Sequence, residues 1–184
     1  MVEPVPSTRF TLGNNRAERV SILGIAPGRQ FVFRGPREVA DQCGAAFGVD
    51  LPASPCRANR QDGRAALRLG PDEWLLIALP DDAVLASLRH SLSRFAHALV
   101  DVSSSDAVFE IRGPSTALLL NAAIPLDLSP KTFPVDACTR TILAKVGVLL
   151  WRTEQECFRL QVARSFAAYV HDVLAEAAWG LPDA

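Results

Sequence analysis

Residues 31–36 read Phe-Val-Phe-Arg-Gly-Pro, and residues 109–114 repeat the pattern as Phe-Glu-Ile-Arg-Gly-Pro. The likeness continues beyond this signature, because Val-Asp-Leu-Pro at residues 49–52 has a counterpart in Leu-Asp-Leu-Ser at residues 126–129 after one deletion. A stretch rich in Ala and Leu follows the signature each time. Matching pieces in the same order indicate an internal duplication of one supersecondary unit.

The pattern of hydrophobic residues predicts similar strands and helices in both halves. One pair of strands is predicted over 19–24 and 30–34, and another over 98–103 and 106–112. Each pair leads into a helix that begins at the proline of the signature and stops at Gly48 or Pro125. Further strands are predicted over 65–69, 74–79, 139–151 and 157–162.

An amphipathic helix is expected to close each half. Its apolar positions are Val84, Leu85, Leu88, Leu92 and Phe95 in the first half, and Phe166, Val170, Val173, Leu174 and Ala177 in the second. Two units of strand-strand-helix-strand-strand-helix type imply an α+β fold, with mainly antiparallel sheets and helices on one side. We expect residues 17–184 to form a single duplicated domain with half-repeats 17–96 and 97–180. The polar, proline-containing residues 1–16 predict an N-terminal arm.

Composition excludes some function classes. A net charge of -1 offers no cluster of cations for nucleic acid. No apolar stretch approaches the roughly 18 residues of a membrane span, and no basic flank precedes an apolar run at the N-terminus. We therefore predict a cytoplasmic protein with no nucleic-acid or membrane partner. The hydrophobic content of 49% predicts some apolar surface for a protein partner.

The residue types that usually carry chemistry are scattered. His90 is expected to be solvated and His97 to start a strand, while His171 is interpreted as structural or exposed, because its neighbour Asp172 should point elsewhere on a helix. Cys43, Cys56, Cys138 and Cys157 lack the spacing of a zinc site and predict reduced, mostly buried thiols. Nucleophile elbows and phosphate-binding glycine loops are absent from the sequence. We predict no catalytic, cofactor-binding or metal-binding residue in this chain.

Each polar cluster of the sequence could either bind a ligand or have a structural role. Asp-Val-Ser-Ser-Ser-Asp at residues 101–106 suits either a ligand or a turn, and the turn is favoured. Asp127 and Asp136 flank a proline-rich loop, where carboxylates usually accept backbone N–H groups. Arg34 and Arg112 could bind an anion, but their duplication favours a shared structural place. The tryptophans are core or interface residues, with the core favoured for each: Trp74, Trp151 and Trp179.

An ordered set of short motifs points to a family. Leu-Gly-Pro-Asp-Glu-Trp-Leu-Leu at 69–76 is followed by Asp-Val-Ser at 101–103 and Arg-Gly-Pro at 112–114. Pro-Leu-Asp-Leu-Ser-Pro at 125–130, Phe-Pro at 133–134, Cys-Thr-Arg-Thr at 138–141 and Arg-Ser-Phe at 164–166 come next. From about residue 20 to the C-terminus, this set resembles the gamma subunit family of heterotetrameric sarcosine oxidase. One departure is Ser129, where many relatives are expected to carry histidine, so a ligand role at that position is not carried over.

The family is similar in turn to the folate-binding part of the glycine-cleavage aminomethyltransferase, whose Asp-x-Ser and Ser-Gly-Pro pieces match residues 101–103 and 112–114. That enzyme's key acid is expected in a Gly-Gly-Ile-x-Asp stretch on the next hairpin. Here residues 143–150 read Leu-Ala-Lys-Val-Gly-Val-Leu-Leu and contain no carboxylate. The resemblance therefore implies the scaffold without the group that manages proton transfer.

What the resemblance implies is a complex with alpha, beta and delta subunits that uses FAD, FMN, NAD and tetrahydrofolate. It would oxidise the N-methyl group of sarcosine to give glycine and hydrogen peroxide, with formaldehyde or methylenetetrahydrofolate as the one-carbon product. The gamma chain would be an assembly and stability subunit without a cofactor of its own. The alternative is a free-standing folate-binding aminomethyltransferase-like protein, which calorimetric titration with a tetrahydrofolate would detect. A ligand-sensing module is a third possibility.

Overall fold

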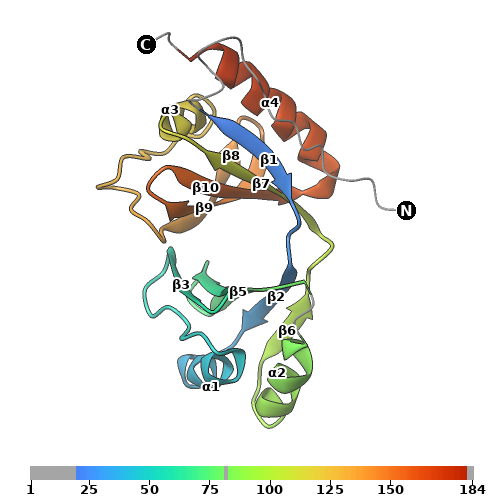
Figure 1. The fold of residues 1–184 in the computed structure, drawn as a ribbon. Coiled ribbons are helices and arrows are strands. Elements are labelled where there is room, and N and C mark those ends of the chain that lie inside the picture. Colours follow the sequence, from blue (N-terminus) through green and yellow to red (C-terminus); the bar gives the residue numbers. More distant parts are fainter. Residues whose placement is uncertain (1–19, 81–82, 182–184) are drawn as a thin grey trace. The chain divides into compact units, whose positions relative to one another are not determined.

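The computed structural model describes residues 20–80 and 83–181 (Figure 1). The first half contains β1 (Ser21–Ile25), β2 (Arg29–Arg34), α1 (Arg37–Phe47), β3 (Arg57–Gln61), β4 (Arg64–Arg68), β5 (Glu73–Ala78) and α2 (Val84–Leu92). The second half contains β6 (Ala98–Asp101), β7 (Asp106–Arg112), α3 (Thr116–Asn121), β8 (Cys138–Leu143), β9 (Val146–Glu154), β10 (Cys157–Ala163), the 3-10 turn η1 (Arg164–Phe166) and α4 (Ala167–Trp179). The same order of elements therefore occurs twice.

The chain forms two compact units, each with one five-stranded sheet. The N-terminal unit comprises Pro27–Ser104, and the C-terminal unit comprises Ser105 onwards together with the described residues up to Ala26. Strand order is β3-β4-β5-β2-β6 in the N-terminal unit and β1-β7-β10-β9-β8 in the C-terminal unit. Every strand pairing in the described residues is antiparallel. The predicted α+β class with mainly antiparallel sheets is confirmed.

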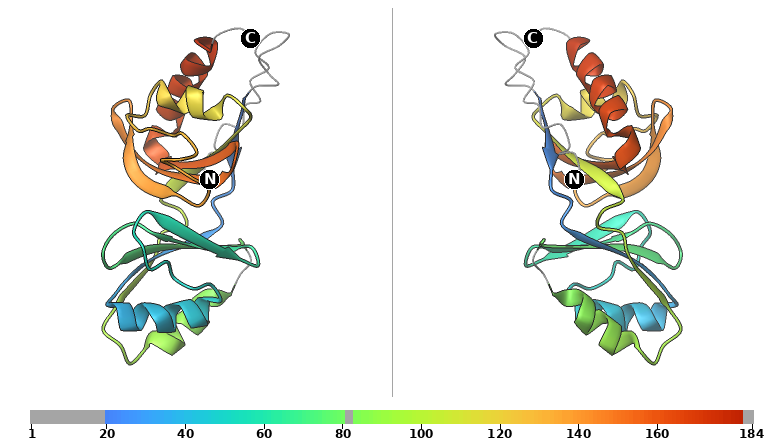
Figure 2. Two further views of the ribbon diagram at one scale, coloured as in Figure 1. Left: turned by 90° about the vertical axis from the view of Figure 1, so that its left-hand side faces the viewer. Right: turned by 90° about the vertical axis from the view of Figure 1, so that its right-hand side faces the viewer.

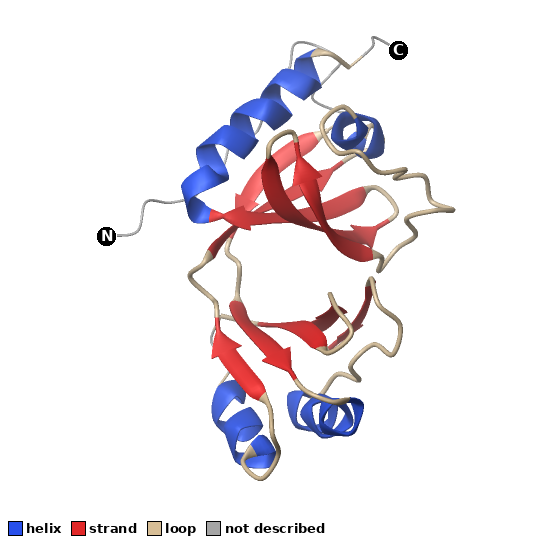
Figure 3. Cartoon of the chain, turned by 180° about the vertical axis from the view of Figure 1, so that it is seen from behind, coloured by secondary structure: helices blue, strands red, loops and turns tan. Residues whose placement is uncertain are grey.

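In each unit the helices cover one face of the sheet (Figures 2 and 3). The N-terminal core is built from Phe31, Phe33 and Trp74 on the sheet, with Phe47 from α1 and Leu88 from α2. Burying one such side chain contributes roughly 1.5–3 kcal/mol. The predicted apolar stripe of the first closing helix is confirmed at Val84, Leu88 and Leu92, which are buried.

The C-terminal core repeats this arrangement. Phe109 and Phe158 from the sheet pack with Leu119 from α3 and with Val170 and Leu174 from α4. Alternation along the strands explains this, because every second residue of a strand points to the same face. The apolar stripe predicted for the second closing helix is thus confirmed at its central positions.

The predicted pairing of neighbouring strands is wrong, because the two halves exchange their first strands. Ser21–Ile25 pairs with β7 of the second half, in the register Ser21 to Arg112, and makes no ladder with β2. Ala98–Asp101 pairs with β2 of the first half, in the register Phe33 to Leu99. The compact units therefore cross the boundary between half-repeats 17–96 and 97–180. That residues 17–184 form a single duplicated domain stays a prediction. The predicted arm at 1–16 lies outside the described residues.

Each half also contains one strand more than predicted. Arg57–Gln61 was expected to be loop, but it pairs with β4 through a turn at Asp62 and Gly63, whose φ angles are 50° and 77°. Positive φ at both central residues is typical of a two-residue hairpin turn. The single strand predicted over 139–151 is a hairpin of β8 and β9, which turns at Ala144 with φ 50°.

Pro36 and Gly48 lie where the sequence indicates, whereas α3 begins two residues after Pro114 and ends at Asn121, short of the predicted stop at Pro125. Pro36 precedes α1 with φ -66°, and its carbonyl oxygen accepts the backbone N–H groups of Val39 and Ala40. Gly48 ends this helix in the left-handed region at φ 80°, donating its N–H to the carbonyl oxygen of Gly44. Among the described helices, none combines the length and apolar character needed to cross a membrane.

Candidate functional site

The arginine of each signature ties the end of a strand to a hairpin turn. Arg34 donates to both carboxylate oxygens of Asp72 at 2.9 and 3.1 Å, and the N–H of Gly35 donates to the Asp72 carbonyl oxygen at 3.1 Å. This contact holds the pKa of Asp72 below its usual range. The turn between β4 and β5 is thereby attached to the strand-to-helix turn that follows β2.

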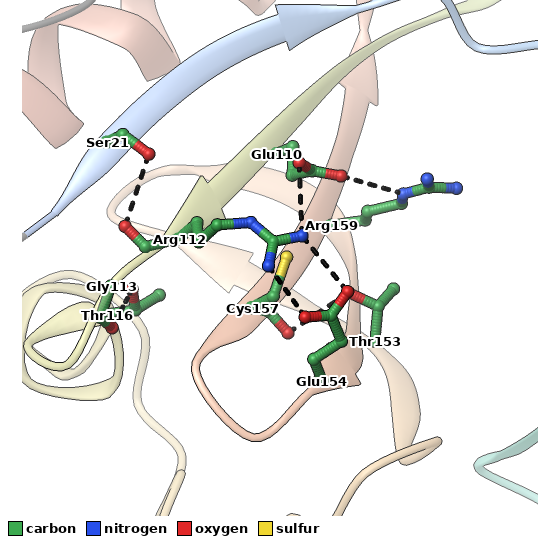
Figure 4. Close-up of polar contacts among 9 residues, drawn as sticks. All are labelled: Ser21, Glu110, Arg112, Gly113, Thr116, Thr153, Glu154, Cys157 and Arg159. Carbon is green, nitrogen blue, oxygen red and sulfur yellow. Dashed lines mark hydrogen bonds and ion pairs between the residues drawn. The ribbon is translucent and has the colours of Figure 1, made fainter.

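Arg112 makes the equivalent contact in the second half (Figure 4). Its two terminal nitrogens lie 2.7 and 3.1 Å from the two oxygens of Glu154, and Gly113 donates its N–H to the carbonyl oxygen of Glu156 at 2.9 Å. The hydrogen bond to Glu154 is the main cause of a raised pKa for Arg112. Both signature arginines thus have a carboxylate partner within their own unit, as the structural reading of the repeat predicts.

A second carboxylate lies between two guanidinium groups beside this contact. Glu110 is 3.7 Å from Arg112 through one oxygen and 3.7 Å from Arg159 through the other (Figure 4). Register places Glu110 opposite Arg159, and Arg112 opposite Cys157, on neighbouring strands. Arg159 also lies over the ring of Trp151, with its central carbon 5.6 Å from the ring centroid. Opposite charges alternate here, which favours a structural network over a reactive centre.

Sequence reasoning missed Arg152, which is buried at 3% exposure. Its guanidinium donates to the carbonyl oxygens of Leu128 at 3.3 Å and Phe133 at 2.7 Å, within the loop that carries the Pro-Leu-Asp-Leu-Ser-Pro motif. It also donates to the carbonyl oxygen of Gln155 at 3.2 Å and lies 4.9 Å from the Phe158 ring centroid. Burial lowers the pKa of Arg152, but a guanidinium remains protonated in proteins. Arg152 therefore connects the loop after α3 to the turn between β9 and β10.

Arg68 likewise connects a loop to a hairpin turn in the first half. It donates to the carbonyl oxygen of Ala53 in the loop after α1, and to those of Gly70 and Pro71 in the turn between β4 and β5, at 3.1 and 2.6 Å. Its central carbon lies 5.1 Å from the Trp74 ring centroid. A buried or half-buried cation is tolerated here because carbonyl dipoles and an aromatic face replace water.

One sequence signal could have revealed this second duplicated arginine. Arg68 is followed six positions later by Trp74, and Arg152 is followed six positions later by Phe158. In both hairpins the register pairs the arginine with that aromatic residue. The acceptors themselves have no sequence signal, because every residue has a backbone carbonyl group.

The turn readings are confirmed for Asp101 and Asp127. Asp101 accepts the hydroxyl and the backbone N–H of Ser103, and these bonds are the main cause of its lowered pKa. Asp127 accepts the N–H of Ser129 at 2.9 Å and the hydroxyl of Thr132 at 2.7 Å, which likewise lower its pKa. Both carboxylates stabilise local backbone conformation.

The histidines lie on different elements of the chain. His90 is exposed on α2, and His97 precedes β6, where its Nδ1 is 2.9 Å from the carbonyl oxygen of Phe95. The expectation that His171 and Asp172 point apart is wrong, because His171 Nδ1 lies 3.3 Å from an Asp172 oxygen. The Asp172 side chain is 80% exposed, so solvent weakens this contact. Within residues 20–80 and 83–181, no group of three His, Cys, Asp or Glu side chains could hold a metal ion.

The thiols are free of disulfides, and three of them are buried: Cys43, Cys138 and Cys157. Burial raises the pKa of Cys43 to about 12 and also raises the pKa of Cys157. A thiol with a raised pKa stays neutral near pH 7 and is a poor nucleophile. Cys56 differs because it is exposed.

Thiol labelling tests this assignment. We expect a maleimide at pH 7 to modify Cys56 rapidly in the folded chain and the other three cysteines only after unfolding, as counted by mass spectrometry. Above pH 9 the unfolded chain ionises Cys43 while the folded chain keeps it neutral, so this group lowers stability as pH rises towards 12. Rapid labelling of a Cys56→Ser variant would contradict the buried assignment.

Two tryptophans follow the prediction of burial and one does not. Trp74 and Trp151 are 1% and 3% exposed, whereas Trp179 at the end of α4 is 61% exposed. The core reading of Trp179 is therefore wrong. Phe166 and Tyr169, near the start of the same helix, are also exposed. Exposed apolar side chains therefore occur at both ends of this last helical segment.

Comparison with known proteins identifies the family. A model of the sarcosine oxidase gamma subunit family matches residues 37–179. The chain belongs to this family. The sarcosine oxidase subunit gamma of Corynebacterium sp. (strain U-96) is 39% identical over 126 residues, which cover 68% of this chain and 62% of that protein. The subunit gamma of Arthrobacter sp. is 37% identical over 61% of this chain and 56% of its own length. The matches thus span about three fifths of these curated relatives.

Comparison with solved structures supports the assignment to the gamma-subunit family. A chain of the heterotetrameric sarcosine oxidase from Corynebacterium sp. U-96, in complex with pyrrole 2-carboxylate, superposes with a TM-score of 0.80 and 32% identity over 91% of this chain and 89% of that one. Aminomethyltransferase T of the glycine cleavage system from Bartonella henselae superposes with a TM-score of 0.66 at 15% identity, over 85% of this chain and 45% of that protein. This second likeness concerns the fold alone. Arg68, Arg112 and Arg152 all lie within the part of the chain that matches the gamma-subunit family model.

Proposed function

We propose that this chain is a non-catalytic assembly subunit of a heterotetrameric sarcosine oxidase. The observation that carries the proposal is its likeness to a chain of that solved complex, at 32% identity and a TM-score of 0.80 over nine tenths of both chains. Function on a shared scaffold depends on the side chains of a site. Whether this chain has a catalytic or a structural role is therefore argued from its polar groups.

Those polar groups support a structural role. The signature arginines bind carboxylates of their own unit, and Arg68 and Arg152 bind loop carbonyl groups. The hairpin that would carry the acid of a folate-dependent aminomethyltransferase, residues 143–150, has no carboxylate. The free-standing folate enzyme therefore lacks a proton-transfer group at that place.

In the proposed complex, alpha, beta and delta subunits carry FAD, FMN and NAD and oxidise the N-methyl group of sarcosine. Glycine and hydrogen peroxide are formed, and the one-carbon unit leaves as formaldehyde or as methylenetetrahydrofolate. This chain contributes contacts and no cofactor. The complex works in the cytoplasm. The exposed Phe166, Tyr169 and Trp179 supply apolar surface of the kind that subunit contacts bury.

Co-purification tests the proposal. We expect this chain to co-elute in stoichiometric amounts with the flavin-containing subunits, when all are expressed together and one flavoprotein subunit carries the affinity tag. Omitting this chain should lower the yield of the flavin-loaded complex. An unrelated tagged flavoprotein, expressed with the chain in the same way, is the control. A chain that elutes alone while the other subunits assemble normally would defeat the proposal.

A further inference from the structure

The edge strand β6 is held to the N-terminal sheet by little apolar contact. Within the described residues it pairs with β2 alone, over four residues (Figure 1). Ala98, Val100 and Asp101 are exposed, and Leu99 is the residue of this strand that packs, half-buried, against the core. On the other side of β2, β5 pairs over six residues, of which five are buried. Burial therefore stabilises β5 in the sheet far more than β6.

Polar contacts hold the C-terminal end of β6. The Arg29 guanidinium donates to one oxygen of Asp101 at 2.9 Å, and the other oxygen accepts the hydroxyl and the backbone N–H of Ser103 at 2.5 and 3.0 Å. Gln30 donates its backbone N–H to Ser103 Oγ at 3.0 Å. Its carbonyl oxygen accepts the backbone N–H of Val102 at 2.9 Å. These five residues, which we call the clasp, join the end of β6 to the start of β2.

The chain that leads into β6 is exposed. Leu92 at the end of α2 is fully buried, but residues 93–96 after it are all exposed. The ring of His97 then lies stacked on that of Phe33 from β2, with 6.3 Å between the ring centroids. Between α2 and the clasp, the chain is thus anchored mainly through this ring contact and one half-buried leucine.

We propose that residues 93–103 form a strap that opens as a unit while the other strands of the sheet stay paired. Parts of a native protein with little apolar burial open at a free energy well below that of global unfolding. The hydrogen bonds of the clasp set how often the strap opens, because they must break before β6 can leave β2. Opening bares the row of backbone N–H and C=O groups on β2 that β6 covers. The strap lies within the N-terminal unit and does not depend on the proposed subunit role.

Amide hydrogen exchange of the full chain, followed by NMR, tests the strap. The probes are Val102, which donates to Gln30, and Val100, since every second amide of an antiparallel strand faces the same neighbour. We expect both to exchange at least about tenfold faster than the amides of β5. Their rates should change little in low urea, because opening of the strap exposes little surface, whereas rates in β5 should rise with urea. The same urea dependence in both strands would overturn the proposal.

A serine pair tests the clasp. Ser103→Ala removes the acceptor of the Gln30 N–H, so exchange at Val100 and Val102 should become about fivefold faster, the usual effect of one lost hydrogen bond. Ser129→Ala is the matched control, because Ser129 also follows a carboxylate by two residues but lies in the C-terminal unit. It should leave exchange of the strap unchanged. Unchanged rates in a folded Ser103→Ala chain would refute the clasp.

A core variant separates opening of the strap from unfolding of its unit. Ala66 is buried on β4, which β5 and β2 separate from β6. Ala66→Gly lowers the stability of the whole unit, so exchange in β5 should become at least about fivefold faster. The strap should exchange as before, because Ala66 stays packed while the strap is open. If Ala66→Gly accelerated exchange equally in β5 and in the strap, the strap would open only with its unit, and the proposal would fail.

Discussion

Replacing Arg152 with leucine is expected to lower the free energy of unfolding by about 3 kcal/mol. The guanidinium group is buried and donates to the carbonyl oxygens of Leu128 and Phe133. Leucine fills part of the space but donates no hydrogen bond, so both carbonyl groups stay buried without a partner. Urea unfolding followed by tryptophan fluorescence measures the change, and hydrogen exchange should rise within residues 126–134.

Two further variants separate the hydrogen bonds of Arg152 from its charge. Arg152→Lys keeps the positive charge but cannot bond two loops at once, so we expect an intermediate loss of stability. Arg37→Leu removes an exposed arginine that pairs with Asp41 on α1, and it should change stability by less than about 0.5 kcal/mol. If Arg152→Leu were as stable as Arg37→Leu, the loop would not depend on this side chain.

The second large effect is expected at Gly28, which precedes β2. Its φ is +73°, and an added Cβ atom would lie 2.4 Å from the carbonyl oxygen of Ala78. Alanine at this position combines a left-handed backbone with a clash against backbone atoms, so Gly28→Ala should destabilise the N-terminal unit by about 2–4 kcal/mol. Thermal unfolding and hydrogen exchange of β2 and β5 measure the effect.

Gly147→Ala is the matched control for Gly28→Ala. The added methyl group meets nothing within 4 Å, and alanine is favoured over glycine within a strand by about 0.5 kcal/mol. We therefore expect unchanged or slightly higher stability. A similar loss in both variants would show that the close approach of Gly28 to Ala78 is not the cause.

Much of the fold could be predicted from local pattern. The repeated signature, the helix stop at Gly48 and the apolar stripe at Val84, Leu88 and Leu92 are features of neighbouring residues, and the structure contains each of them. The missed strand β3 has no apolar alternation, since Arg57–Gln61 reads Arg-Ala-Asn-Arg-Gln. Its turn at Asp62 and Gly63 was nevertheless a hairpin signal in the sequence.

The candidate site was predictable only in part. Turn roles for Asp101 and Asp127 follow from residue type, because short carboxylates bond to the backbone N–H groups two residues further on. The role of Arg152 does not follow in this way, because its acceptors are carbonyl groups 19 and 24 residues away.

The sequence by itself determined the α+β class and the family resemblance, and it predicted the duplication, since all three depend on residue order and spacing. Tertiary structure alone decided which strands pair. The connections at 26–28 and 102–105 are short enough for hairpins, yet they carry the chain from one sheet to the other. A strand offers the same row of N–H and C=O groups to any partner, so the pattern that makes Ser21–Ile25 a strand cannot specify that it joins β7 of the second half and leaves β2 to pair with β6.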